Sequence, residues 1–231
     1  MLHNLSFIED PTRLLRGVRF EKRYYMNMEP QTLKLVKEAA RSKILARVSL
    51  ERVWEELKHI LLEQRPGAVL FRLQDLQMWE FLFPVVNYAP VKSVLDELPR
   101  SINVLRAWNP AEQGEPWLAY LIALLHLTEW GAAVVICHRY NLGNRQREKV
   151  AAALSGWRKA VDSLGNRDTD TMSELVGQVA PLPREADPLL LTYLPDHASR
   201  ARFRRVLTAV YYDSPSISGK DLRAMGFEPG P

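Results

Sequence analysis

Residues 30–45 read PQTLKLVKEAARSKIL, and residues 49–63 read SLERVWEELKHILLE. In both stretches apolar side chains recur every three or four residues, with charged side chains between them. This spacing is typical of an amphipathic α-helix, whereas a half-buried β-strand alternates every second residue. Ser49 stands where a helix N-cap is expected. The two stretches therefore predict a pair of helices, each with one buried face.

The helical spacing continues through most of the chain. Prolines repeatedly stand where a first helical turn is expected, a position at which proline loses no hydrogen bond. These are Pro11, Pro30, Pro66, Pro90 and Pro116. The best strand candidate, residues 132–136, continues a helical pattern instead. We therefore predict an all-α fold with a first unit at 1–84, a second at 85–213 and the start of a third, truncated unit at 214–231.

Composition sets broad limits on the class of protein. The 231 residues are 47% hydrophobic, enough for one large core or two small ones, and 25% charged, an ordinary value for a folded chain. The net charge of +4 indicates only a weak preference for anionic partners. The single cysteine, Cys137, excludes an internal disulfide and a cysteine-based zinc site. With no secretory signal before Asp10, we expect a cytoplasmic protein.

The most apolar window, Trp117 to Cys137, contains His126 and Glu129 and is interrupted at Gly131. An ionised glutamate in the middle of a bilayer is costly. We therefore predict a buried helical hairpin here and no membrane partner.

The stretch that points to chemistry is EDPTRLLRGVRF, residues 9–20. On a helix of about 100° per residue, Asp10 and Gly17 lie within roughly 60° of Arg13, one turn before it and one turn after it. Asp10 and Arg13 then share a face, and Gly17 leaves that face without a side chain. Glu9, four residues before Arg13, is placed to hold its guanidinium. Leu14, Val18 and Tyr25 fall at roughly 100–140° from Arg13, on the side that we expect to face the core.

An Asp–Arg pair of this kind can read a nucleotide base. Aspartate only accepts hydrogen bonds and arginine only donates them. Cytosine and adenine present an amino donor beside a ring-nitrogen acceptor, whereas guanine and uracil present the reverse order. The pair Asp10–Arg13 is therefore able to favour C and A without a nucleic-acid template.

A simpler interpretation competes with this one and is favoured by the residues alone. Asp10 before Pro11 is a common helix start, and Glu9–Arg13 is then a surface ion pair worth under about 1 kcal/mol. An intermediate arrangement is also open, in which one oxygen of Asp10 caps the helix and the other stays available to a ligand.

At these residues the chain resembles the class II tRNA nucleotidyltransferases, or CCA-adding enzymes, and the bacterial poly(A) polymerases. Their neck carries E-D-x-x-R followed by x-x-R-A-x-R-F, and here Glu9, Asp10, Arg13, Arg16 and Arg19-Phe20 match, with Gly17 in place of the commoner alanine. The resemblance implies that Asp10 and Arg13 pair with incoming CTP or ATP, that Glu9 orients Arg13, and that Arg16 belongs to the same site.

Further segments carry the resemblance. Residues 48–57, VSLERVWEEL, are similar to the family's S-x-E-R-x-x-x-E-L segment, which braces the neck. Residues 218–222, SGKDL, are similar to part of the tail. The match is strong over about residues 5–84, moderate over 216–231 and weak between them. The neck residues are most similar to those of large bacterial members that carry DHH and CBS domains.

The resemblance also implies what lies elsewhere. The family's catalytic head holds a Gly-Ser segment and an Asp-x-Asp that binds Mg²⁺, and neither precedes Glu9. Asp168-Thr169-Asp170 spells Asp-x-Asp, but in a polar stretch that we interpret as a loop or helix cap. We therefore expect a fragment without catalytic residues or a metal site, inactive alone, whose partners are tRNA, CTP or ATP and the head of the same polypeptide. A homodimer stays open.

Basic residues outside the motif are candidates for RNA contacts. We predict contacts from Arg19, Arg23, Arg200, Arg204 and Lys220, of which Lys220 follows a glycine that can form a phosphate-binding turn. The alternative for the run Arg200 to Arg205 is a solvated helix face, and the sequence does not separate the two.

Other conspicuous residues are assigned to structure. His126 lacks the aspartate that would follow it in an HD hydrolase and is predicted to be a core histidine. Phe20 and Tyr24 lie near the basic face and can support a base. The large aromatic residues predicted to be in the core are Trp54, Trp79, Trp108, Trp117, Tyr120, Trp130 and Trp157.

These observations leave two hypotheses. The first is the C-terminal, RNA- and nucleotide-binding part of an enzyme that adds CMP or AMP to tRNA 3′ ends. The second is a non-catalytic helical scaffold or oligomerisation module, in which the Asp–Arg pair is only a cap and a surface bridge.

Overall fold

The computed structural model describes residues 6–108, 114–166, 171–211, 223 and 225 of the chain. Over these residues the fold is all-α, as predicted, with no strand. The helices, including the 3₁₀ helices η1 and η2, are α1 (Ser6–Glu9), α2 (Arg13–Arg23), α3 (Pro30–Arg41), η1 (Ile44–Arg47), α4 (Leu50–Leu61), α5 (Pro66–Asp75), α6 (Trp79–Leu82), α7 (Tyr88–Trp108), α8 (Pro116–Leu125), α9 (Trp130–Arg139), α10 (Asn144–Gly165), α11 (Met172–Val179), η2 (Arg184–Ala186), α12 (Asp187–Tyr193) and α13 (His197–Tyr211).

Local sequence explains many of the helix boundaries. Pro30, Pro66 and Pro116 are the first residues of α3, α5 and α8, as predicted. Ser49 occupies the N-cap position of α4, although its side chain makes no capping hydrogen bond. Pro11 lies just before α2, whose first helical residue is Arg13.

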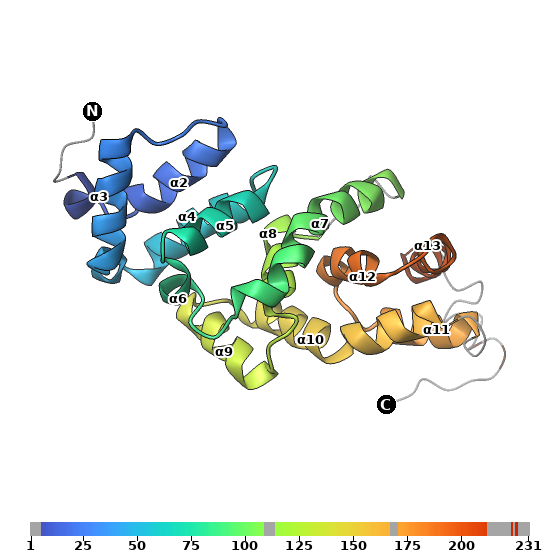
Figure 1. Ribbon diagram of the computed structural model, residues 1–231. Helices are drawn as coiled ribbons and strands as arrows, with labels where there is room; N and C mark the ends of the chain where they lie inside the picture. Colours follow the sequence, from blue (N-terminus) through green and yellow to red (C-terminus); the bar gives the residue numbers. More distant parts are fainter. Residues whose placement is uncertain (1–5, 109–113, 167–170, 212–222, 224, 226–231) are drawn as a thin grey trace.

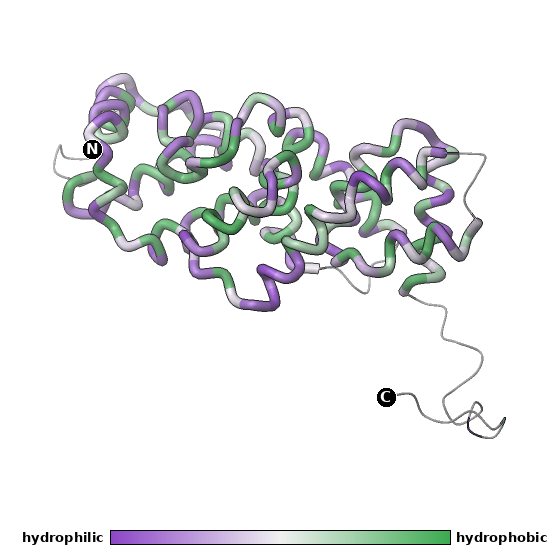
Figure 2. The backbone as a smooth tube through the Cα atoms, turned by 90° about the horizontal axis from the view of Figure 1, so that it is seen from below, coloured by the Kyte–Doolittle hydropathy of each residue, from purple (hydrophilic) through white to green (hydrophobic). Residues whose placement is uncertain are grey.

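The first helices pack around α2, α4 and α5 (Figure 1). Each contributes one apolar face, which includes Leu14, Leu15 and Val18 from α2. The buried residues of α4 and α5 repeat the three-and-four spacing of the sequence. In Figure 2 hydrophobic and hydrophilic segments alternate along many of the helices, as expected for helices with one buried face.

A continuous hydrophobic core joins the early helices to the later ones. Trp54 of α4 stacks on Tyr140 with ring centroids 4.9 Å apart and meets Trp117 of α8 edge-on at 5.4 Å. The Tyr140 hydroxyl also donates to the backbone oxygen of Leu82 at 2.6 Å. The division at residue 84 stays a prediction, since the core crosses it.

The apolar window from Trp117 to Cys137 forms two helices, α8 and α9, separated by residues 126–129. Every residue of α8 from Leu118 to Leu125 is buried, as predicted for an internal helix. In α9 only Ala133, Ile136 and Cys137 are buried, so the predicted burial holds for the first helix and for one face of the second. None of the helices in the described part of the chain is long and apolar enough to cross a membrane.

The later helices form the other end of the molecule. The second half of α7 packs on α12, and α10 packs on α11, α12 and α13. In Figure 1 these elements lie at the opposite end from α2 and α3. Segments that are far apart in sequence, such as α7 and α12, therefore meet around one core.

Two predicted core residues are exposed. Tyr25 is 75% exposed, because α2 ends at Arg23 and Tyr25 adopts a left-handed φ of 54°, so the helical pattern does not reach it. Trp130 is 42% exposed, because it is the first residue of α9, whose buried face is made by Ala133, Ile136 and Cys137. Trp54, Trp79, Tyr120 and Trp157 are buried as predicted.

Candidate nucleotide and nucleic-acid interface

The corner between α1 and α2 is built around the carboxylate of Asp10. Its Oδ1 accepts hydrogen bonds from the Thr12 hydroxyl at 2.6 Å and from the Thr12 backbone N–H at 3.2 Å. The guanidinium of Arg52, on α4, donates to the same oxygen at 3.0 Å. The Thr12 hydroxyl contributes most to a lowered pKa of Asp10, with smaller contributions from Arg52 and Arg13. Asp10 is therefore held as a carboxylate.

The other oxygen of Asp10, Oδ2, has no hydrogen-bond or ion-pair partner in the described ranges. The residue is partly exposed rather than buried. One oxygen thus holds the turn before α2, while the second remains an open acceptor. The prediction that Asp10 caps this helix is wrong, because Thr12 occupies the N-cap position of α2 and that position has no side-chain capping bond. Ligand binding by Asp10 itself stays a prediction.

Arg13 is fixed at the first turn of α2 by Ser6. Its Nη1 donates to the Ser6 hydroxyl at 2.5 Å and to the Ser6 backbone oxygen at 3.4 Å. Ser6 is buried, while Arg13 is half-buried. A guanidinium carries five N–H donors, so the donors on Nη2 and Nε remain for another acceptor.

The predicted contact from Glu9 to Arg13 is absent among the residues that the structure places. Glu9 is exposed and Ser6 takes the expected partner position. The reason is that Glu9 ends α1 and Arg13 begins α2, with a turn at residues 10–12 between them. The helical four-residue spacing on which the expectation rested does not apply across this turn.

The basic face of α2 lies against acidic residues of α4 and the residues that follow it. Arg16 is 3.8 Å from Glu56, and Arg19 is 3.9 Å from Glu56 and 3.2 Å from Glu63. Arg23 is 3.5 Å from Glu63. The side chains of Arg16 and Arg23 are about half exposed, at 47% and 50%, whereas that of Arg19 is only 12% exposed. Arg16 and Arg23 thus face solvent more than Arg19 does.

A hollow of about 410 Å³ opens where α2 and α4 end. Its lining includes Arg19 and Arg23, which were predicted, and Lys22, His59 and Arg65, which were not. Their positions in sequence gave little signal, because the hollow joins two helix ends that are about 40 residues apart. The lining carries more cationic than anionic side chains and so suits an anionic ligand.

Exposed aromatic rings border this hollow. Tyr24 is 57% exposed and packs against Phe20 with ring centroids 5.9 Å apart. The guanidinium of Arg23 lies over the Tyr24 ring at 5.7 Å, and Tyr25 projects from the left-handed turn beyond α2. Exposed tyrosines beside arginine and lysine are typical of surfaces that stack nucleic-acid bases.

The second predicted basic cluster lies far from Asp10, on α13 (Figure 1). Arg200 donates from Nε to the backbone oxygen of Leu194 at 3.2 Å, and the Arg204 guanidinium lies 5.8 Å from the centre of the Trp108 ring. Lys220 and the Asp168-Thr169-Asp170 segment fall outside the residues that the structure describes.

His126 is a core histidine, as predicted. It is 2% exposed, with Nδ1 2.7 Å from the Ala123 backbone oxygen and Nε2 2.6 Å from the Tyr193 hydroxyl. Burial lowers its pKa. Over the described ranges no group of three or more His, Cys, Asp or Glu side chains is arranged to hold a metal ion.

Sequence comparison identifies proteins that are similar to this chain. Residues 25–89 match a family model described as a probable RNA and SrmB-binding site of polymerase A. The whole chain is 28% identical to the A-adding tRNA nucleotidyltransferase of Geobacter sulfurreducens and 29% identical to that of Halalkalibacterium halodurans. It spans 27% and 51% of the lengths of these two relatives.

Solved structures with the same fold agree. The Thermotoga maritima CCA-adding enzyme complexed with tRNA has a TM-score of 0.83 at 26% identity, over 100% of this chain and 56% of its own. A CCA-adding enzyme with CTP has a TM-score of 0.84 at 26% identity, over 100% of this chain and 54% of its own. The resemblance predicted from the sequence is confirmed: the chain is similar in sequence and in fold to the C-terminal region of class II CCA-adding and A-adding tRNA nucleotidyltransferases.

Proposed function

We propose that this chain is the RNA-binding and nucleotide-selecting part of a tRNA nucleotidyltransferase that adds CMP or AMP to tRNA 3′ ends in the cytoplasm. The observation that carries the proposal is the corner at Asp10 and Arg13, where an open carboxylate oxygen and a guanidinium held by Ser6 come from residues three positions apart, at the two ends of one turn. Similarity to enzymes crystallised with tRNA and with CTP, over the full length of this chain, supports the same function.

Base selection follows from the hydrogen bonds that each group can accept or donate. Asp10 Oδ2 accepts from the amino group of cytosine or adenine, and a free N–H of Arg13 donates to the neighbouring ring nitrogen. Uracil and guanine place a carbonyl oxygen opposite the carboxylate, and this leaves two acceptors facing each other. Glu9 and Arg16 flank the pair, and Arg16 is exposed enough to contact a phosphate.

The hollow beyond α2 is proposed to hold the RNA. Arg23, Lys22 and Arg65 supply charge for phosphates, and Tyr24 and Tyr25 supply faces on which unpaired bases stack. Arg19 acts mainly by positioning Glu63 and Glu56, since its side chain lies between them. Arg200 and Arg204 are proposed as weaker, separate phosphate contacts.

The described residues do not fit the Mg²⁺ that the family's chemistry requires, because no cluster of carboxylates is arranged to hold it. Bond formation is therefore assigned to the catalytic head of the same polypeptide. The residues of this chain bind and orient the nucleotide and the RNA.

The decisive experiment uses the full polypeptide, with its head, and measures addition of each nucleotide to a tRNA that lacks its terminal residues. We expect Asp10→Ala and Arg13→Ala to reduce the preference for CTP or ATP over UTP by about 10- to 100-fold. Glu51→Gln, at an exposed position of α4, is the matched control.

An unchanged preference in both variants would reject base selection by this pair and favour the helical scaffold. Binding of tRNA to the isolated chain tests the hollow separately. Lys22→Ala with Arg65→Ala should weaken tRNA binding and reduce its salt dependence, while Lys92→Ala, on α7, should change neither.

A further inference from the structure

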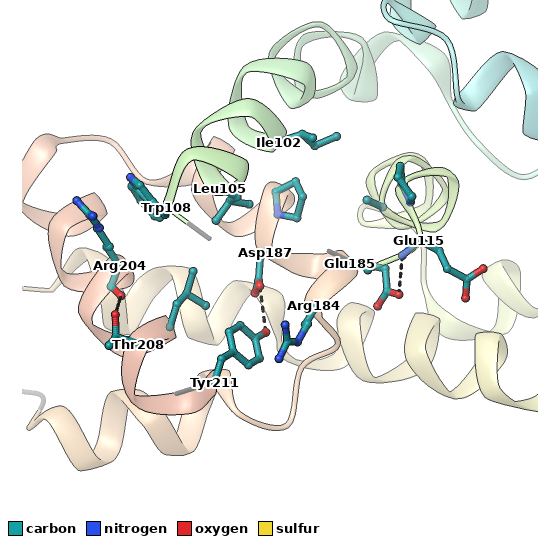
Figure 3. A pocket seen from close by; sticks show the side chains of 15 residues that line it. Ile102, Leu105, Trp108, Glu115, Arg184, Glu185, Asp187, Arg204, Thr208 and Tyr211 are labelled. Atoms are coloured by element: carbon teal, nitrogen blue, oxygen red, sulfur yellow. Dashed lines mark hydrogen bonds between the residues drawn. The ribbon is translucent and has the colours of Figure 1, made fainter. Parts of the chain in front are cut away.

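A second cavity lies at the far end of the molecule, between the end of α7, the start of α8, η2–α12 and α13 (Figure 3). Its volume is about 150 Å³. Most of the wall is apolar and includes Ile102, Leu105, Pro116 and Leu207. An apolar cavity of about this size accommodates one benzene ring in another protein. The cavity therefore has room for a single six-membered ring.

One wall of the cavity carries an unsatisfied carboxyl group. Asp187 is only 6% exposed, and its Oδ2 accepts a hydrogen bond from the Tyr211 hydroxyl at 3.0 Å. Its Oδ1 is buried without any hydrogen-bond partner in the part of the chain that is described. Buried polar atoms are nearly always hydrogen-bonded, so we expect this oxygen to form a hydrogen bond with a bound molecule.

The groups around Asp187 favour its neutral form. Burial is the largest influence and raises its pKa to about 8, with a smaller contribution from Glu185. Tyr211 and Arg184 oppose the shift. A neutral carboxyl group offers an O–H donor beside an acceptor oxygen, a pattern that matches the amide or amidine edge of a heterocyclic base.

Cationic and aromatic groups line the same cavity. The Arg184 guanidinium lies 3.8 Å from the centre of the Tyr211 ring, and Arg204 lies over Trp108. Glu185, the acidic neighbour, is neutralised by Lys149 at 2.5 Å. Arg184 and Arg204 are thus placed to attract a phosphate attached to a bound base.

We propose that this cavity binds a pyrimidine nucleotide, with the edge of the base on the Asp187 carboxyl and the phosphate toward Arg204 and Arg184. The volume of about 150 Å³ favours a single ring over the two fused rings of a purine, and the free Oδ1 fixes the orientation of the base. The nucleotide is either free or an unstacked residue of an RNA chain, since both present the same chemistry. The site is separate from Asp10 and Arg13 and does not depend on the proposed base selection.

The test is calorimetric titration of CMP, UMP and AMP into the 231-residue chain carrying Asp10→Ala and Arg13→Ala, so that the other candidate site does not contribute. We expect CMP and UMP to bind with a Kd on the order of 1 mM and AMP to bind at least about tenfold more weakly. Leu105→Trp, which fills the cavity, should abolish the binding of CMP while circular dichroism shows the fold retained.

Two variants of Asp187 test the carboxyl. Asp187→Ala should weaken CMP binding at least about tenfold, since it removes both hydrogen-bonding oxygens. Asp187→Asn keeps a neutral donor and acceptor and should retain binding without the decrease above pH 8 expected for the parent chain. Absence of CMP binding, equal binding of AMP, or binding that survives Leu105→Trp would overturn the proposal.

The source of the nucleotide is settled in the same experiment. Tighter binding of a short single-stranded pyrimidine RNA than of CMP, sensitive to Asp187→Ala, assigns the cavity to an RNA residue. Equal affinity assigns it to the free nucleotide. A failure at this cavity leaves the tests at Asp10 and Arg13 unaffected.

Discussion

The chain contains two Asp-Pro steps at helix starts, and they have opposite chemistry. Asp10-Pro11 precedes α2, and Asp187-Pro188 begins α12. Asp10 is partly exposed and its pKa is lowered, most strongly by the Thr12 hydroxyl. Asp187 is buried, and desolvation raises its pKa to about 8. The dipeptide specifies a helix start, whereas the surrounding helices decide whether the carboxyl is charged.

The largest expected effect of this contrast is on the pH dependence of stability. The pKa of Asp187 is higher in the folded state, so its contribution to stability is present below about pH 4 and is lost as pH rises toward 8. The slope is at most about 1.4 kcal/mol per pH unit. Thermal unfolding followed between pH 5 and 8 should show a smaller loss of Tm in Asp187→Asn than in the parent chain.

Asp10 should behave in the opposite way. Its pKa is lowered on folding, so its contribution is present above about pH 4 and is lost as pH falls through the folded pKa. Subtracting each variant's curve of stability against pH from that of the parent chain cancels the contributions of His126 and the other titratable groups that both chains share. If the Asp187→Asn difference had the same sign as the Asp10→Asn difference, the contrast would be wrong.

A smaller loss of stability is expected when the Thr12 hydroxyl, which donates a hydrogen bond to Asp10, is removed. Thr12→Val preserves the shape of a side chain that is only 3% exposed but removes its hydroxyl. We expect a loss of about 1 kcal/mol in the free energy of unfolding, because one hydrogen bond to a carboxylate is lost. NMR titration should show the pKa of Asp10 rising toward 3.8. An unchanged Asp10 pKa would assign its shift to the Thr12 backbone N–H and to Arg52 instead.

The smallest effect is expected for Arg52, whose side chain is 58% exposed. Arg52→Gln should cost less than about 0.5 kcal/mol in stability, because exposed ion pairs contribute little. Under the proposed function its effect should appear in nucleotide choice, since Arg52 binds Oδ1 of Asp10 and the proposal assigns Oδ2 to the base. Denaturant unfolding and nucleotide-addition assays on the full polypeptide measure the two quantities; a large stability loss with unaltered choice would contradict this role.

The helices were predictable because their signals are local. The spacing in residues 30–45 and 49–63 and the prolines at helix starts depend only on neighbours in the sequence. Arg13 and Asp10 could be singled out in the same way. The expected position of Tyr25 was wrong because one left-handed residue ends the periodic pattern.

The partners of the site were not predictable in this way. Arg52 meets Asp10 across 42 residues of sequence, and Ser6 takes the place expected for Glu9. The burial of Asp187 depends on α7 and α13. Contacts of this kind depend on how the helices pack. The spacing of residues along one sequence does not predict them.

Helix α4 touches the Asp10 corner through Arg52 near its start and lines the hollow through His59 near its end. A helix rises about 1.5 Å per residue, so these contacts are separated by about 10 Å along its axis. Under the proposed function, α4 therefore sets the distance between a nucleotide at the corner and RNA in the hollow. Deleting one residue between them would shorten that gap only slightly, but would turn the two contacts by about 100° relative to each other.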